Sequence, residues 1–340
     1  MDMTFENWEQ LPPDAEAELR KMRKSLQKRN RKQIFTCVIL VIALLFSAVQ
    51  FGIPAAEKRY WDPTACSWLE SVPDLELTMQ VYTELFGQGQ LLMPLQIRKT
   101  GFASYDIDAC FLEWEAQHRL TSLSYRSAGI EKGRWNADAN FWNEMQRGII
   151  YRHPDLEQNE LLTGSLDKTA ALLQELPDYI QLQAALTFSY DMSMEGFERF
   201  MNQYHASEAN FFWAVLRSGD TGRSCGIHLT EYHSQRYQPS LWNTTDYPDL
   251  FPDRLNWSAA DMEQHVLSML RFSSDQVKNG TGILPDWADA DFYDTYLSYM
   301  EENGVKVFGC YVITSPKVLL EMLDGSKVSY IHLSDAWIGL

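Results

Sequence analysis

A run of twenty residues without charge constrains this chain more than any other feature. The run, Ile34–Ile53, reads IFTCVILVIALLFSAVQFGI, and only Thr36, Ser47 and Gln50 in it are clearly polar. A helix of this length is about 30 Å long at about 1.5 Å per residue, which matches the hydrocarbon core of a bilayer. A buried helix of a soluble protein rarely stays apolar on every side for so long. The sequence therefore predicts one transmembrane helix at residues 34–53.

The flanks of this run predict its orientation. Eight basic residues and no acidic residue lie in the segment 20–32, whereas only two basic residues follow the run, beside Glu57. The positive-inside rule then places residues 1–33 in the cytoplasm as a tail and the rest of the chain outside the cell membrane. A signal peptide cleaved near Ala55–Ala56 is the alternative. Such peptides have a shorter leader and a shorter apolar stretch, so we expect a retained single-pass anchor in the lipid bilayer.

Charge is distributed unevenly along the chain, whose net charge is −17. Residues 1–33 carry eight basic and six acidic side chains, while the remaining residues carry 21 basic and 40 acidic ones, a net charge of −19. A region so acidic lacks the positive surface by which proteins bind nucleic acid. We therefore expect no direct contact with nucleic acid. No feature of the sequence names a ligand for the outer region.

No motif indicates catalysis, a metal or a cofactor. The chain has no G-x-S-x-G, H-E-x-x-H or phosphate-loop pattern. His228 and His233 flank Glu231, but residues five apart share neither a helix face nor a strand face. Residues 165–168 fit S-x-x-K and residues 99–101 fit K-T-G, in the reverse of the order found in penicillin-recognising enzymes. We expect no enzymatic activity and no cofactor.

The five cysteines do not form a disulfide framework. Cys37 lies in the apolar run, and the other four have no C-x-x-C spacing. Cys110 and Cys310 lie in apolar segments and are expected to be small buried side chains. Whether one or two disulfides form outside the membrane is left open by the sequence.

The tail before the apolar run has the pattern of an amphipathic helix that begins after Pro12–Pro13. Acidic residues come first in this helix and basic residues later, which is the order that the helix dipole favours. Its apolar side chains form two sets with helical spacing, which are Phe5, Trp8 and Leu11, then Ala15, Leu19, Met22 and Leu26. Large apolar groups on a short tail favour a binding partner, and the candidate contact residues are Phe5, Trp8, Leu11, Leu19 and Met22. The alternative is that the basic residues only fix topology and bind anionic lipid, while the first dozen residues are disordered.

The region outside the membrane is predicted to have an α+β fold in two domains. A proximal domain at 54–155 is expected to be mainly antiparallel β, with strands at Leu75–Phe86, Leu91–Thr100, Tyr105–Glu115 and Arg119–Tyr125. Pro94 suggests an edge position or a bulge for the second of these strands. Helices are expected at Phe141–Ile150 and Leu161–Leu176, with a helical linker at 156–177.

A distal domain at 178–340 is expected to be mixed α/β. Its predicted strands are Ile180–Tyr190, Phe211–Arg217, Val305–Thr314 and Val328–Leu333. Its predicted helices are Ser193–Tyr204, Ser258–Phe272, Ala288–Asn303 and Ser315–Leu323. Ser258 and Asp261 have the spacing of a capping box, and Val305–Thr314 has the strongest strand pattern in the chain.

Several segments, taken in order, also carry a family resemblance. They are the basic tail before a single span, then Tyr60–Thr64, Lys99–Asp106, Pro177–Tyr179, Leu186–Asp191 and Val307–Leu323. In these segments the chain resembles the membrane-anchored anti-sigma factors of Firmicutes, which have paired N- and C-terminal sigma-factor-regulator domains. The resemblance implies transcription regulation and signal transduction: the tail would hold an extracytoplasmic-function sigma factor at the membrane, while the outer domains sense or scaffold.

Two other classes of function stay open beside this one. The first is a membrane-tethered extracytoplasmic binding or scaffold protein that has no sigma-factor partner. The second is an envelope enzyme of an unrecognised type.

Overall fold

The computed structural model describes residues 13–67, 72–115, 119–137, 140–143, 165–205, 209–219, 225–229, 245–252, 257–279, 283–285, 287–325 and 327–338. The chain divides into two compact units, Met1–Tyr60 and Trp61–Leu340. Each unit is described by itself below.

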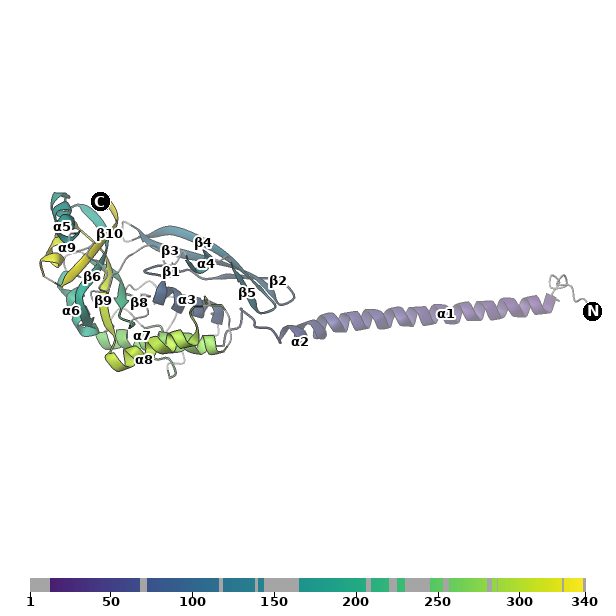
Figure 1. The fold of residues 1–340 in the computed structure, drawn as a ribbon. Coiled ribbons are helices and arrows are strands. Elements are labelled where there is room, and N and C mark those ends of the chain that lie inside the picture. Colours follow the sequence, from purple (N-terminus) through teal and green to yellow (C-terminus); the bar gives the residue numbers. More distant parts are fainter. Residues whose placement is uncertain are drawn as a thin grey trace, which may run out of the picture. The chain divides into compact units, whose positions relative to one another are not determined.

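The first unit is helical throughout its described residues. Helix α1 (Pro13–Ser47) continues through a π-helical turn, η2 (Ala48–Gly52), into α2 (Ile53–Glu57) (Figure 1). The start at Pro13 is as predicted, because proline fits the first turn of a helix. Residues 20–57 are long and apolar enough to cross a membrane, with a mean hydropathy of 2.6 over their most apolar window and no buried residue in it. This unit is therefore consistent with the predicted single-pass anchor.

The second unit is built around helix α3 (Asp74–Phe86), which corrects a prediction. We expected a strand at Leu75–Phe86, and that was wrong: all twelve of these residues are buried in a helix. Asp74 and Glu76 lie in the first turn, where the helix dipole favours acids. The Thr78 and Thr83 hydroxyls donate to carbonyl oxygens four residues earlier, which satisfies these buried polar groups within the helix.

A first antiparallel sheet follows α3 in the chain. Its strands are β1 (Leu91–Leu92), β2 (Gln96–Gly101), β3 (Ser104–Glu115), β4 (Arg119–Glu131) and β5 (Arg134–Ala137). The order is β1-β3-β4-β5, and β2 pairs with β3 alone. The predicted strand Leu91–Thr100 is thus divided in two around Pro94, and β2 is an edge strand, as this proline suggested. Strand β4 is longer than predicted, and β5 was not predicted.

A second antiparallel sheet carries the distal part of the chain. Its strands are β6 (Ile180–Ser193), β7 (Asn210–Leu216), β8 (Cys225–His228), β9 (Lys306–Thr314) and β10 (Val328–Ile338), in the order β10-β6-β9-β7-β8. Strand β9 is central, and eight of its nine residues are buried. The continuous apolar run Val305–Thr314 predicted this, since a strand covered on both faces has no polar alternation.

The helices of the second unit mostly begin and end where their capping residues predicted. They are α4 (Asn140–Asn143), α5 (Ser165–Glu175), α6 (Met194–His205), α7 (Ala259–Lys278), α8 (Ala290–Asn303) and α9 (Pro316–Asp324). Ser258 and Asp261 form the predicted capping box at the start of α7, and the hydrogen bonds from the Ser258 N–H and hydroxyl lower the pKa of Asp261. Gly304 ends α8 with a positive φ of 75°. Residues 144–150 of the predicted helix Phe141–Ile150 lie outside the described residues.

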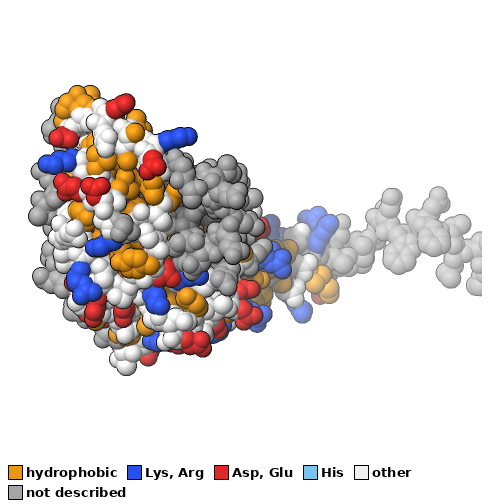
Figure 2. All heavy atoms as spheres, turned by 60° about the vertical axis from the view of Figure 1, so that its left-hand side comes forward, with side chains coloured by type: hydrophobic (Ala, Val, Ile, Leu, Met, Phe, Trp, Pro, Cys, Tyr) orange, Lys and Arg blue, Asp and Glu red, His pale blue; other side chains and the backbone are white. Residues whose placement is uncertain are grey.

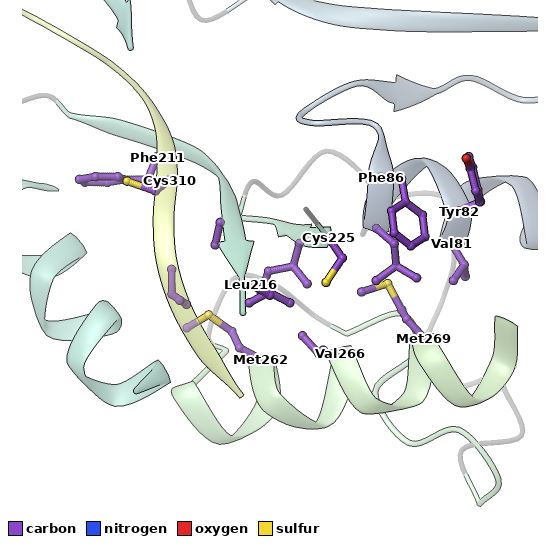
Figure 3. Packing of buried hydrophobic residues seen from close by; sticks show 14 of the residues in the cluster. Val81, Tyr82, Phe86, Phe211, Leu216, Cys225, Met262, Val266, Met269 and Cys310 are labelled. Atoms are coloured by element: carbon purple, nitrogen blue, oxygen red, sulfur yellow. The ribbon is translucent and has the colours of Figure 1, made fainter. Parts of the chain in front are cut away.

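The core joins parts of the second unit that are far apart in the sequence. Figure 3 shows Val81 and Phe86 of α3 facing Met269 of α7, with Cys225 of β8 beside them. Helix α3 also contacts β1 of the first sheet. The described segments on both sides of residues 156–177 therefore contribute to one hydrophobic cluster. The division into domains at this linker stays a prediction.

Candidate functional site

The predicted partner-binding residues lie at the N-terminal end of the chain. Phe5, Trp8 and Leu11 fall outside the described residues. Leu19 lies on α1, although its side chain is not among those described. Met22 is 60% exposed, and Leu26, one turn later on the same side of the helix, is 56% exposed. Helix α1 thus presents an apolar pair that no described residue covers.

Basic side chains surround this apolar pair. All eight of the basic residues between positions 20 and 32 are exposed on α1. The segment therefore combines a hydrophobic stripe with a positively charged surface. Such a helix binds either an apolar groove on a partner or the surface of an anionic membrane.

A buried polar network in the second unit was not predicted from the sequence. The carboxylate of Glu84, near the end of α3, accepts a hydrogen bond from the His228 main-chain N–H at 3.1 Å. The same oxygen, Oε1, lies 3.0 Å from Nε2 of His265 on α7. The main-chain carbonyl of Glu84 accepts a bond from the Trp213 indole at 2.9 Å, which satisfies a carbonyl in the last turn of the helix. One residue thus joins α3 to β7, β8 and α7.

The geometry of His265 defines how many protons the network holds. Its Nδ1 lies 2.8 Å from the carbonyl oxygen of Asp249, which only accepts, so Nδ1 carries a hydrogen. The contact between Nε2 and Glu84 Oε1 then needs one further proton, on one atom or the other. The pair is therefore an imidazolium with a carboxylate, or a neutral imidazole with a carboxylic acid. Both forms are neutral overall, which suits a pair whose side chains are only 0% and 7% exposed.

These buried groups have a structural role. The described partners of Glu84 and His265 include main-chain atoms and one another, and Glu76, also on α3, accepts a bond from the Leu95 N–H at 3.1 Å. Little in the sequence indicates this network, because Glu84 lies in a segment whose pattern is typical of a strand. His265 lies in a helix that was predicted, but its partner is 181 residues away.

The motifs weighed for catalysis or metal binding are described only in part. No group of three or more His, Cys, Asp or Glu side chains that could hold a metal ion occurs among the described residues. His228 is buried in β8, and its neighbours Glu231 and His233 fall outside the described part of the chain. Ser165 begins α5, and Lys168 is exposed on that helix.

All five cysteines are free thiols. Cys310 is buried as predicted, while Cys110 is only partly buried. Burial raises the pKa of Cys310 well above its ordinary value and that of Cys225 to about 12. A thiol that stays protonated is a poor nucleophile, so these two act as small apolar side chains in the core.

Comparison with known families adds one match. Residues 173–335 match the model of a family described as sigma factor regulator C-terminal. The match extends from the end of α5 into β10 and includes the three distal segments that carried the resemblance. No curated protein and no solved structure matches the chain.

Proposed function

Because residues 173–335 of this chain match the model of the sigma factor regulator C-terminal family, we propose that the whole protein is an anti-sigma regulator of the membrane. It sequesters an extracytoplasmic-function sigma factor through its N-terminal tail, and it acts by binding rather than by catalysis. The family match is the observation that carries this proposal. The alternative is a tethered extracytoplasmic scaffold without a sigma-factor partner.

The first unit supports a location in the cell membrane. The segment 20–57 has the length and hydropathy of a membrane span. Eight basic residues lie in its N-terminal part, at positions 20–32, and only Lys58 and Arg59 follow its end closely. With the tail in the cytoplasm, as the positive-inside rule favours, residues 1–33 meet cytoplasmic proteins. The second unit then stands outside the membrane.

The tail has apolar and acidic side chains of the kinds that could bind a sigma factor. Amphipathic helices bind by placing apolar anchors at i, i+3, i+4 and i+7 spacing in a groove of the partner. We propose that the anchors are Phe5, Trp8, Leu11, Leu19 and Met22. Acidic residues of the tail, among them Glu6, Glu9 and Asp14, would face the basic surface by which a sigma factor binds DNA, which favours encounter and blocks promoter contact.

The topology can be tested with a native cysteine. Cys66 is exposed just after the first unit, whereas Cys225 and Cys310 are buried. In a parent without Cys37 and Cys110, an impermeant thiol reagent should label Cys66 on whole cells. When Cys66 is replaced with serine and Ser25 with cysteine, labelling should require permeabilised cells.

The reverse pattern of labelling would contradict the proposed orientation. A mature chain that begins near Glu57 would instead indicate a cleaved signal peptide.

The anti-sigma activity can be tested in the tail. Trp8→Ala combined with Leu19→Ala should release the sigma factor and raise transcription from its promoters. Loss of one aromatic anchor typically costs about 2 kcal/mol, or roughly thirtyfold in affinity. The measurements are promoter activity in cells and co-purification of the sigma factor with the membrane protein.

A matched control replaces one exposed aromatic residue and one exposed leucine of the second unit. Phe102 is 40% exposed and Leu172 is 48% exposed, so Phe102→Ala with Leu172→Ala should leave repression unchanged. If the tail variant is as abundant as the parent and still represses fully, the sequestration proposal is wrong and the scaffold alternative gains.

A further inference from the structure

A hollow of about 360 Å³ lies where β6 ends and α6 begins. Side chains from three segments line it, among them Tyr190, Asp191 and Ser193 of β6, Arg199 and Gln203 of α6, and Lys327 before β10. Most of these side chains are polar. The volume is within the range of small-ligand sites, roughly 300–1,000 Å³.

The hollow follows from an irregularity in the second sheet. The pairing of β6 with β9 shifts register between Thr187 and Met192. On its other side, β6 pairs with β10 only as far as Phe188, opposite Val328. Tyr190 and Asp191 therefore lie beyond the last pair with β10, in the interval where the pairing with β9 is interrupted. Tyr190 is 53% exposed as a result, and a bulge of this kind often re-aims side chains near functional sites.

The charges in the hollow are unbalanced. Neither Arg199 nor Lys327 has an ion pair with any of the described residues, although Lys327 Nζ lies 3.5 Å from the amide oxygen of Gln203. The lining carboxylate, Asp191, lies 3.8 Å from Nε of Arg217, so it is already opposed by a cation. Two positive charges thus face the hollow without an acidic partner of their own.

The two acidic residues of α6, Glu195 and Glu198, do not supply the missing partner. Among the described residues, neither forms an ion pair with Arg199 or Lys327. Elsewhere on the second unit, acidic and basic side chains are interspersed on the face that Figure 2 shows. A pair of unmatched cations is therefore notable in a region whose net charge is strongly negative.

We propose that this hollow binds a small ligand through an anionic oxygen group, a carboxylate or a phosphate, held between Arg199 and Lys327. A cationic nitrogen donates strong, charge-assisted hydrogen bonds to either group. The ring of Tyr190 offers an apolar and aromatic surface for the rest of the ligand. The bound group would join α6 to the segment before β10. This inference goes beyond the proposed function and does not rest on it.

The test uses the full chain in a neutral detergent, titrated calorimetrically at constant ionic strength. One probe is inorganic phosphate, and the other is an alanine dipeptide with a free carboxylate, compared with its C-terminal amide. At least one probe should bind saturably, and the amide should bind less than the free dipeptide if the carboxylate is recognised. Arg199→Gln and Lys327→Gln should each weaken binding by about tenfold or more.

Lys317→Gln is the matched control, because Lys317 is an exposed cation on α9 outside the hollow. It should not alter binding, whereas Arg199→Lys should retain most of it. Binding of phosphate alone or of the dipeptide alone identifies the source of the anionic group. The proposal is overturned if neither probe binds, if both hollow variants bind like the parent, or if Lys317→Gln weakens binding as much as they do.

Discussion

Glu84→Ala is expected to destabilise the second unit by about 3–5 kcal/mol, because two buried groups each lose a hydrogen-bond partner and a buried side chain is truncated. The two groups are the His228 N–H and Nε2 of His265. The substitution also empties space beside a helix whose residues are buried on every side. The measurement is the free energy of unfolding of residues 61–340 in urea, taken from the midpoint and the slope of the transition.

Two further variants show how much of the loss in stability comes from the buried hydrogen bonds of Glu84. Glu84→Gln keeps an oxygen that accepts from the His228 N–H, so its loss should be smaller, about 1–3 kcal/mol. Glu301→Ala removes a carboxylate from an exposed pair, in which Arg271 lies 2.6 Å away, and should cost less than about 1 kcal/mol. Equal losses for Glu84→Ala and Glu301→Ala would mean that the buried network contributes no more than a surface contact.

Gly226→Ala should also be severe, with a loss of about 3 kcal/mol or more. A Cβ at this buried position would overlap the Ala214 carbonyl oxygen and the Trp213 indole. Neither group can easily move, since Ala214 lies on the paired strand β7 and the indole is hydrogen-bonded to Glu84. Urea unfolding and the near-ultraviolet circular dichroism of the tryptophans would both report the change.

Gly129→Ala is the control for the previous substitution. Gly129 also lies in an antiparallel sheet, but the nearest atom that its Cβ would meet is 3.7 Å away. This is an ordinary contact, so the free energy of unfolding should change by only about 0.5 kcal/mol. If Gly226→Ala were equally mild, β8 would not be packed against Trp213 as closely as described.

Much of the distal fold could be predicted because its signals are local. Ser258 and Asp261 mark the start of α7 by a hydrogen-bonded box that involves four successive residues. Gly304 marks the end of α8, where a positive φ favours glycine. Strand β9 was recognisable from a run of apolar residues that is bounded by Gly304 and Ser315. None of these signals depends on residues far away in the chain.

Helix α3 was mispredicted because its environment is not encoded locally. A helix that is buried on every side has no polar face, so the 3.6-residue periodicity that identifies amphipathic helices is absent. Leu75, Leu77, Met79 and Val81 alternate with other residues as a half-buried strand would. The better indications were its length of thirteen residues and Pro73 followed by acids in the first turn.

The candidate sites, like α3, depend on contacts that local sequence patterns do not reveal. The tail residues Phe5, Trp8 and Leu11 were selected by spacing alone, and their role stays a prediction. The hollow beside α6 could not be predicted from the sequence, because Arg199 and Lys327 are 128 positions apart. In the folded chain both residues line one hollow, beside the shift in register of β6.

The long-range bonds of α3 have a consequence for biosynthesis. Glu84 is made 129 residues before Trp213 and 181 residues before His265. At about 5–20 residues per second, the second interval lasts roughly ten to forty seconds. Until the first interval ends the apolar side chains of α3 have no native partner on β7, and until the second ends they have none on α7. We therefore expect the nascent chain to need shielding from aggregation until α7 has been synthesised, and a chain truncated before α7 should be a substrate for quality-control proteases.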